Sequence, residues 1–241
     1  MREMAFICPT RGRPERAREF AASVMATAAH PERLDIQFYV DDDDARRADY
    51  GAMVEDFAGE ARGGRVTLTV GPAVGVPHAV NKLVAACDTD VLLSANDDQV
   101  FMDAGWDATL DAAIDDYADG IYCIWFNDGW ESQNFCTFPI VSRTWVDTLG
   151  YLQFPFFEHF YADIWIWMLA KTVERARYIP EVMAEHRHWK TGKAELDDTY
   201  RRLAGDSDDP RQARDRAVID RFERYFLADV EALQAVMEGR S

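Results

Sequence analysis

Two adjacent carboxylates follow an apolar run of strand length in residues 91–101. Asp97 and Asp98 come directly after this run, and a second apolar pair, Val100 and Phe101, follows them. Acids in this position lie where a buried strand emerges from the core. Carboxylate oxygens suit Mg²⁺ or Mn²⁺, and a cation held by one or two side chains keeps positions for phosphate oxygens. The alternative is a turn that merely ends the strand.

Polar residues also follow the two strands predicted earlier in the chain. Residues 5–8 precede a turn that contains Thr10 and Arg11, and residues 35–40 end in an acidic run at 41–44. The carboxyl ends of parallel strands meet at one sheet edge, where ligands bind in open α/β sheets. We therefore expect these clusters to converge, although an acidic run can also be a plain solvated loop.

The second half of the chain places aromatic residues beside carboxylates. Residues 150–163 include Phe157, Glu158, Tyr161 and Asp163. Aromatic rings stack on the apolar faces of sugars while carboxylates accept from hydroxyls, although such density is also typical of a core. Asp163 precedes a predicted helix at 164–173, where the helix dipole favours the ionised form, so a simple helix cap is the alternative role.

Two histidines close the list of candidate ligands. His186 and His188 lie in a segment expected to be extended, so both side chains point to one face and could reach a metal or a phosphate. Residues 193–209 lack an apolar stripe and predict a loop. Residues 212–238 carry a stripe that predicts one long terminal helix.

Charge and composition limit the function classes. The chain has 241 residues, a hydrophobic fraction of 48% and a formal charge of -17, which argues against a general polyanion-binding surface and makes nucleic acid an unlikely partner. The four cysteines lie far apart and predict reduced core residues. With no signal peptide or membrane segment expected, the sequence predicts a cytoplasmic protein.

Strands and helices alternate through the first half of the chain. This order predicts an α/β fold with a mostly parallel, doubly wound, Rossmann-like sheet and helices on both faces. We divide the chain into residues 1–120, residues 121–200 and a C-terminal helical extension at 201–241.

The ordered landmarks resemble the GT-A-fold glycosyltransferases, in particular the family 2-like group, over residues 6–200. They resemble that family's opening Pro-Thr turn, its strand-ending acids, the helix before its metal strand, and its Asp-x-Asp motif at 96–98. The resemblance implies a nucleotide-sugar-binding half at 1–120 and an acceptor-binding, catalytic half at 121–200. The implied donor-binding residues are Pro9, Thr10, Arg11, Arg13, Asp41, Asp42, Asn81, Lys82, Asn96 and Asp97.

The same resemblance implies roles for the remaining candidates. Asp98 would hold Mn²⁺ or Mg²⁺, with His186 or His188 completing the coordination. Asp163 would be the general base of an inverting transfer from a nucleotide-diphosphate sugar, with a UDP-sugar favoured, to a hydroxyl acceptor. Glu158 is a weaker catalytic candidate, and the aromatic residues Trp130, Phe157 and Tyr161 would shape the acceptor site, for which even a modified nucleobase stays open.

Departures from the family pattern keep other functions open. Asn96 and Ala162 stand where the family often has acids, so a sugar-nucleotide-binding or carbohydrate-binding domain without catalysis is one alternative. Asp41 and Asp43 loosely fit a haloacid-dehalogenase-like phosphohydrolase, but Ala45 replaces the expected Thr or Val. A nucleotidyltransferase is a third alternative, although its Gly-rich first loop is missing.

Overall fold

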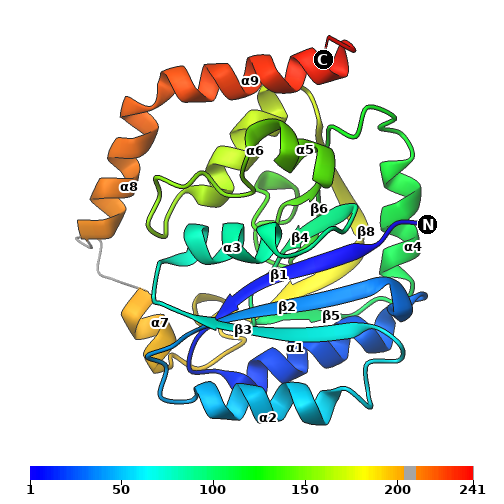
Figure 1. Ribbon diagram of the computed structural model, residues 1–241, viewed down its shortest axis with the longest axis vertical. Coiled ribbons are helices and arrows are strands. Elements are labelled where there is room, and N and C mark those ends of the chain that lie inside the picture. The colour runs from blue at the N-terminus through cyan, green and yellow to red at the C-terminus, as the bar shows by residue number, and fades with distance from the viewer. Residues whose placement is uncertain (204–209, 241) are drawn as a thin grey trace.

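A computed structural model describes residues 1–203 and 210–240 of the chain (Figure 1). Its eight-stranded sheet has the order β3-β2-β1-β4-β7-β6-β8-β5. Strands β1, β2, β3 and β4 pair in parallel, as do β6 and β8, whereas β4–β7, β6–β7 and β5–β8 are antiparallel. The strands are β1 (Met4–Thr10), β2 (Leu34–Asp41), β3 (Arg65–Gly71), β4 (Val91–Ser94), β5 (Gln99–Phe101), β6 (Cys123–Asn127), β7 (Ile140–Ser142) and β8 (Ala176–His186).

Helices cover both faces of this sheet, which confirms the predicted doubly wound α/β class. Figure 1 shows α1 and α2 on one side and α3, α5, α6 and α9 on the other, and the buried residues form two matching core clusters. The helices are α1 (Pro14–Thr27), α2 (Arg47–Phe57), α3 (Val76–Ala85), α4 (Trp106–Ile114), α5 (Arg143–Leu149), α6 (Ala162–Thr172), α7 (Asp198–Leu203), α8 (Pro210–Arg221) and α9 (Glu223–Met237).

Strand β1 shows why the centre of the sheet is apolar throughout. Phe6 and Cys8 point into the core beneath α1, while Ala5 and Ile7 point into the core beneath α3. A parallel strand with helices on both faces needs apolar side chains at every position. Its fixed position sets where Thr10 leaves the sheet. Pro14 then starts α1, as expected for proline in the first helical turn.

Two local predictions were wrong. The terminal helix is broken at Phe222 into α8 and α9, because this ring packs into an aromatic cluster with ring centroids 4.7 Å from Phe156 and 5.7 Å from Phe154. Helix α7 lies in the stretch predicted as a loop, of which residues 204–209 lie outside the described residues.

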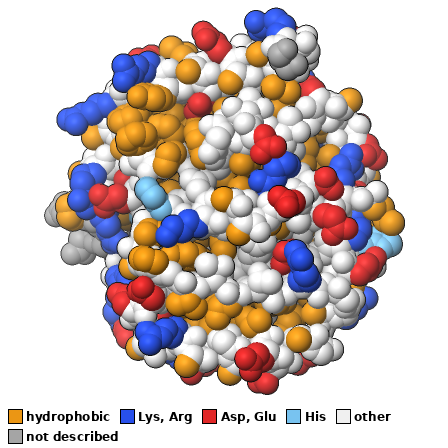
Figure 2. Space-filling view, viewed as in Figure 1, with side chains coloured by type: hydrophobic (Ala, Val, Ile, Leu, Met, Phe, Trp, Pro, Cys, Tyr) orange, Lys and Arg blue, Asp and Glu red, His pale blue; other side chains and the backbone are white. Residues whose placement is uncertain are grey.

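The four cysteines are free and buried in the core, as the sequence predicts. Among the described residues, no helix has both the length and the apolar character needed to cross a membrane. Figure 2 shows one face of the molecule, on which hydrophobic side chains gather near the junction of α8 and α9. Tyr225 and Leu227 are exposed apolar residues of α9, and the exposed Phe156, from the segment before α6, packs against Phe222 at this junction.

Candidate functional site

Asp97 and Asp98 lie in the loop between β4 and β5, at the carboxyl end of the parallel strands. Both side chains are buried, with 6% and 5% of their surfaces exposed. Buried carboxylates need compensating donors or cations. The partners of the two acids come from distant parts of the chain and define the site.

Asp97 is bound by the turn that follows β1. Thr10 Oγ1 donates to Asp97 Oδ2 at 2.6 Å, and Arg13 Nη1 donates to Oδ1 at 3.2 Å. Burial nevertheless holds the pKa of Asp97 above its usual range, because Arg13 only partly offsets the loss of hydration and Asp98 adds a like charge. The predicted convergence of residues from the ends of β1 and β4 is therefore present at Asp97.

Asp98 is bound by residues from the far end of the chain. The Tyr200 hydroxyl donates to Asp98 Oδ2 at 2.6 Å, and His186 Nε2 lies 3.4 Å from the same oxygen. Burial alone would raise the pKa of Asp98, but the contacts with His186 and Tyr200 hold it below its usual value. Asp98 Oδ1 and His186 Nδ1 are buried without a hydrogen-bond partner among the described residues.

The pair formed by Asp98 and His186 fits a divalent cation. A buried carboxylate oxygen without a partner has lone pairs to offer, and an imidazole nitrogen lies beside the same carboxylate. Within residues 1–203 and 210–240, no group of three His, Cys, Asp or Glu side chains converges as a complete metal site. Mg²⁺ is commonly held by one or two carboxylates plus substrate phosphates, so an incomplete protein site suits a cation that arrives with a nucleotide.

The ring of His188 lies next to that of His186. Its ring stacks on Trp130 with centroids 5.0 Å apart, and Trp130 is also 5.4 Å from the His186 ring. Burial, together with the neighbouring His186, lowers the pKa of His188 to about 4, so this imidazole is neutral near pH 7. Trp130, predicted for the acceptor side, thus lies against the two histidines.

Sequence reasoning missed Asp197 and Tyr200. The Asp197 carboxylate accepts two hydrogen bonds from Arg13, at 2.8 Å from Nε and 2.6 Å from Nη2, and the guanidinium lies 3.8 Å from the centroid of the Tyr200 ring. A local signal was available, because Asp197 also accepts from Tyr200 N at 2.9 Å, the bond of a helix N-cap. That signal predicts a helix start but says nothing about Arg13.

The acidic run after β2 surrounds the turn after β1. Arg11 pairs with Asp41 at 2.8 Å and also with Asp43, while Asp42 is exposed. Asp44, which was not singled out from the sequence, is buried and accepts from the backbone N–H groups of Gly12 at 2.7 Å and Arg46 at 2.8 Å. Asp44 therefore fixes the conformation of the turn.

Of the other predicted donor residues, Asn81 and Asn96 are placed differently. Asn81 Nδ2 donates to the Gln153 carbonyl at 2.7 Å, and its Oδ1 accepts from the N–H groups of Leu152 and Gln153, so this amide anchors the chain before the aromatic segment. Asn96 is exposed beside the buried acids. The last two predicted donor residues are Pro9, which lies at the end of β1, and Lys82, which is exposed on α3.

Asp163 lies at the start of α6 in a poorly hydrated position. Burial raises its pKa to about 6, and Oδ1 accepts from Ile164 N at 2.8 Å. Cys136 lies within electrostatic range of both Asp163 and Asp128, and the Asp128 carbonyl accepts from His186 N at 2.9 Å.

The aromatic segment before α6 is divided between core and surface. Phe157 is 1% exposed and packs against Trp165, whereas its neighbour Phe156 is 55% exposed. The ring that faces solvent is therefore Phe156, and Phe157 supports the segment from below. Tyr161 has a φ of 66°, an uncommon conformation for a residue other than glycine, directly before Asp163.

A buried carboxylate from α8 holds this segment in place. Asp215 accepts from the backbone N–H groups of Glu158 at 2.8 Å, His159 at 2.9 Å and Phe160 at 2.7 Å. The Glu158 side chain is turned toward α8, where it pairs with Arg214 at 2.8 Å. Helix α8 thus fixes the backbone that leads to Asp163.

Replacing Asp215 with alanine should lower the free energy of unfolding by about 3 kcal/mol, because three backbone donors lose a charged acceptor inside the protein. Chemical denaturation measures this change. Asp220→Ala is the matched control, since Asp220 is an exposed acid on the same helix and its removal should change stability by less than about 0.5 kcal/mol. Equal effects of the two substitutions would contradict the anchoring role of Asp215.

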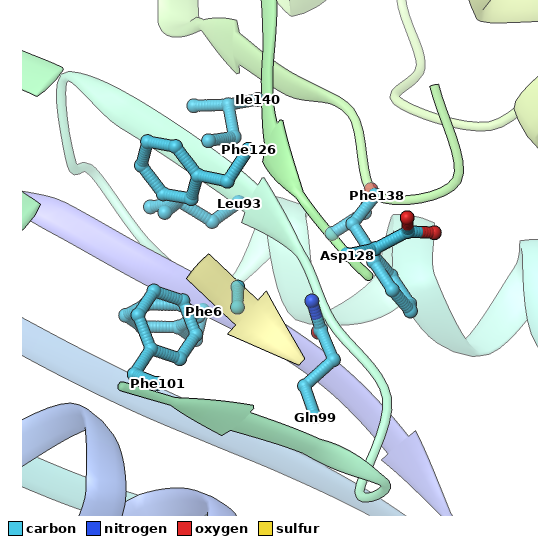
Figure 3. A pocket seen from close by; sticks show the side chains of 10 residues that line it. Phe6, Leu93, Gln99, Phe101, Phe126, Asp128, Phe138 and Ile140 are labelled. Atoms are coloured by element: carbon cyan, nitrogen blue, oxygen red, sulfur yellow. The ribbon is translucent and has the colours of Figure 1, made fainter. Parts of the chain in front are cut away.

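Two cavities adjoin the acidic loop. One, of about 140 Å³, is lined by Asp97 and Asp98, by the cations Arg16, Arg187 and Lys193, and by Glu19. The other, of about 10 Å³, has room for one water molecule, and Gln99, Asp128 and Phe138 line it together with aromatic rings from the core (Figure 3). The larger cavity thus places three basic side chains near the two carboxylates, and two of these cations, Arg187 and Lys193, are paired with Glu185.

Comparisons with known proteins rest on structure alone. No protein-family model matches the sequence, and no curated protein matches it significantly. A mannosyltransferase from Pyrobaculum calidifontis, solved in complex with GDP-Man and Mn²⁺, has a TM-score of 0.59 and 15% identity over 100% of this chain and 76% of its own. TarS from S. aureus has a TM-score of 0.58 and 12% identity over 93% of this chain, which spans 43% of TarS.

A third solved structure belongs to another class of enzyme. A cytidylyltransferase from Leptospira borgpetersenii has a TM-score of 0.51 and 8% identity over 90% of this chain and 93% of its own. At these identities the similarity establishes the architecture and not the reaction. The curled, mostly parallel sheet and its flanking helices have the arrangement of the two glycosyltransferases. The chain therefore has the GT-A fold that its sequence landmarks predict.

Proposed function

We propose that this protein is a glycosyltransferase that moves a sugar from a nucleotide-diphosphate sugar to a hydroxyl acceptor with the help of Mn²⁺ or Mg²⁺. The observation that carries the proposal is the pairing of Asp98 with His186 at the carboxyl edge of a GT-A sheet, beside Thr10 and Arg13. A UDP-sugar is the favoured donor. The mannosyltransferase solved with GDP-Man and the TarS structures solved with UDP and UDP-GlcNAc support a nucleotide-sugar substrate.

The residues around the site have separate proposed roles. Asp98 and His186 would hold the cation, which supplies positive charge to the departing diphosphate. Arg13 lies beside them and can pair with phosphate oxygens through its planar guanidinium. Asp41 and Arg11, at the ends of β2 and β1, face the expected position of the nucleoside.

Asp163 is the proposed general base. A carboxylate accepts a proton from an acceptor hydroxyl best when its pKa lies close to the working pH, and burial has moved the pKa of Asp163 to about 6. Trp130, Tyr161 and the aromatic segment around Phe157 form the proposed acceptor side, with Phe156 as its exposed ring. In this proposal, the hydroxyl of an acceptor bound beside these rings lies within reach of Asp163, at the start of α6.

The raised pKa of Asp163 makes a prediction about pH. Below about pH 6 the carboxyl is protonated and cannot accept a proton, so kcat/KM should fall about tenfold for each pH unit below that value. A pH profile of initial rates at saturating cation measures this limb. The profile of Asp163→Asn should lack this fall at low pH. A wild-type kcat/KM that stays constant between about pH 5 and pH 7 would argue against Asp163 as the base.

The proposed reaction can be tested with a panel of nucleotide sugars. The protein is incubated with each sugar nucleotide in the presence of Mn²⁺, and released nucleoside diphosphate is measured with and without a chelator. Metal-dependent release supports the transferase. Thermal stabilisation without any release would instead indicate a sugar-nucleotide-binding domain that lacks catalysis.

A nucleotidyltransferase is the second candidate, because the cytidylyltransferase matches nearly its full length to this chain. Such an enzyme would release pyrophosphate from a nucleoside triphosphate and a sugar phosphate. The turn after β1 contains Gly12 as its single glycine, which offers little of the backbone cradle that triphosphates use. Pyrophosphate release in a parallel assay that supplies a nucleoside triphosphate and a sugar phosphate with Mn²⁺ would decide for this alternative.

A further inference from the structure

Tyr200 on α7 binds Asp98, and Asp197, the residue before α7, binds Arg13. From these contacts we infer that Tyr200 competes with the cation for the carboxylate of Asp98 in the free protein, so that residues 197–200 are a built-in competitor for cation and diphosphate. The inference rests on the proposed function. It concerns residues that the predicted donor and metal sets do not contain.

The competition with the cation follows from the geometry at one oxygen. Tyr200 donates its hydroxyl proton to Asp98 Oδ2 at 2.6 Å, and His186 Nε2 faces that same oxygen at 3.4 Å. A cation shared with His186 Nε2 lies beside this oxygen even when the unpartnered Asp98 Oδ1 is its ligand. The hydroxyl proton repels a cation at this distance and draws on the carboxylate charge that would hold it, so the hydrogen bond and the cation weaken each other.

The competition with the diphosphate follows from Asp197, the residue directly before α7. Its carboxylate accepts two hydrogen bonds from Arg13, at 2.6 and 2.8 Å, in the planar geometry with which a guanidinium also binds phosphate. The Tyr200 ring, 4% exposed, lies 3.8 Å from that guanidinium. A diphosphate that pairs with Arg13 takes the place of the Asp197 carboxylate and so loosens the segment that carries Tyr200.

Through these two contacts, α7 couples the binding of the cation to the binding of the diphosphate. The diphosphate displaces Asp197 from Arg13 while the cation displaces Tyr200 from Asp98, and both events release one helix. Each ligand therefore removes part of the cost of binding the other, which is positive coupling in the thermodynamic sense. Thr199 adds a third attachment, because its hydroxyl donates to the Arg11 carbonyl at 2.8 Å.

Binding of Mn²⁺ alone tests the inference without any turnover. Free Mn²⁺ is followed by electron paramagnetic resonance in titrations of the full chain and of Tyr200→Phe, which keeps the ring on Arg13 and removes only the competing hydroxyl. Tyr200→Phe should bind Mn²⁺ about tenfold more tightly, as expected when a hydrogen bond to a charged group no longer has to be broken. Asp197→Asn should also tighten binding, because the helix is held less firmly.

Tyr225→Phe is the matched control, since this tyrosine lies on α9 and makes no contact with the acids. Its Mn²⁺ affinity should equal that of the wild type. Hydrogen exchange adds a second measurement: Mn²⁺ with UDP should speed exchange of the amides in α7 of the wild type. Circular dichroism of each variant shows that the fold is intact.

The possible outcomes separate this inference from the proposed function. Unchanged or weaker Mn²⁺ binding by Tyr200→Phe overturns the inference even if the wild type transfers sugar, because Tyr200 then supports Asp98 instead of blocking it. Tighter binding without turnover of any nucleotide sugar supports the inference and counts against the transferase. Absence of Mn²⁺ binding in every variant overturns the inference, since no cation then competes at Asp98.

Discussion

Replacing Asp98 with asparagine should lower kcat/KM for the proposed transfer by about 10²–10³-fold, the range typical for loss of one charge-stabilising group. The amide keeps the size of the side chain and can still accept from Tyr200, so the fold should survive. What is lost is the negative charge that holds the cation beside His186. Initial rates of nucleoside diphosphate release at saturating Mn²⁺ measure the effect.

Asp88→Asn is the control for this substitution. Asp88 is an exposed acid in the segment before β4, so the same chemical change removes one charge from the same half of the chain without altering the site. Its rate should match that of the wild type. If Asp98→Asn retained more than about a tenth of the wild-type kcat/KM, the cation would have to be held elsewhere.

Replacing Asp163 with asparagine should lower kcat by about 10²–10⁴-fold, the usual contribution of a general base. The amide oxygen can still accept from Ile164 N, so α6 should start at the same residue. Donor binding should change little, because the contacts of Asp163 are separate from those of Asp97 and Asp98. Steady-state kinetics with varied donor separates kcat from the donor KM.

Asp147→Asn provides the matched control, as Asp147 is an exposed acid on α5. A variant of Asp163 with normal kcat would remove this residue from the base role and leave Glu158 as the other carboxylate of the segment. Glu158 is the weaker choice in the structure, because it is exposed and paired with Arg214. Removing the charge of Asp163 and of Glu158 in separate variants, Asp163→Asn and Glu158→Gln, and comparing their kcat at one pH distinguishes these carboxylates.

The sequence predicts the layers of the fold well because its apolar residues follow the periods of buried strands and one-sided helices. Strand β1 is apolar at successive positions, which only a sheet covered on both faces explains. The ends of strands likewise mark where polar side chains leave the core. Asp97 and Thr10 could therefore be expected at one edge, and they meet at 2.6 Å.

Residues that act through long-range contacts could not be predicted in the same way. Asp197 meets Arg13 across 184 positions of the chain, and Tyr200 meets Asp98 across 102, and no local period records such a pairing. The break at Phe222 was missed for a related reason. The apolar stripe continues through it, and only packing against Phe156 shows where the helix turns.

The antiparallel pairing of β5 with β8 has a consequence for how the site comes into being. Gln99 pairs with His186, and the Asp98 carbonyl accepts from Arg187 N at 2.8 Å. The imidazole therefore reaches the carboxylate only after β8 has taken its place in the sheet between β6 and β5. During synthesis, a nascent chain that ends before residue 176 contains every acid of the first half yet lacks the histidine. The proposed cation site is thus complete only when β8 has paired with both β5 and β6.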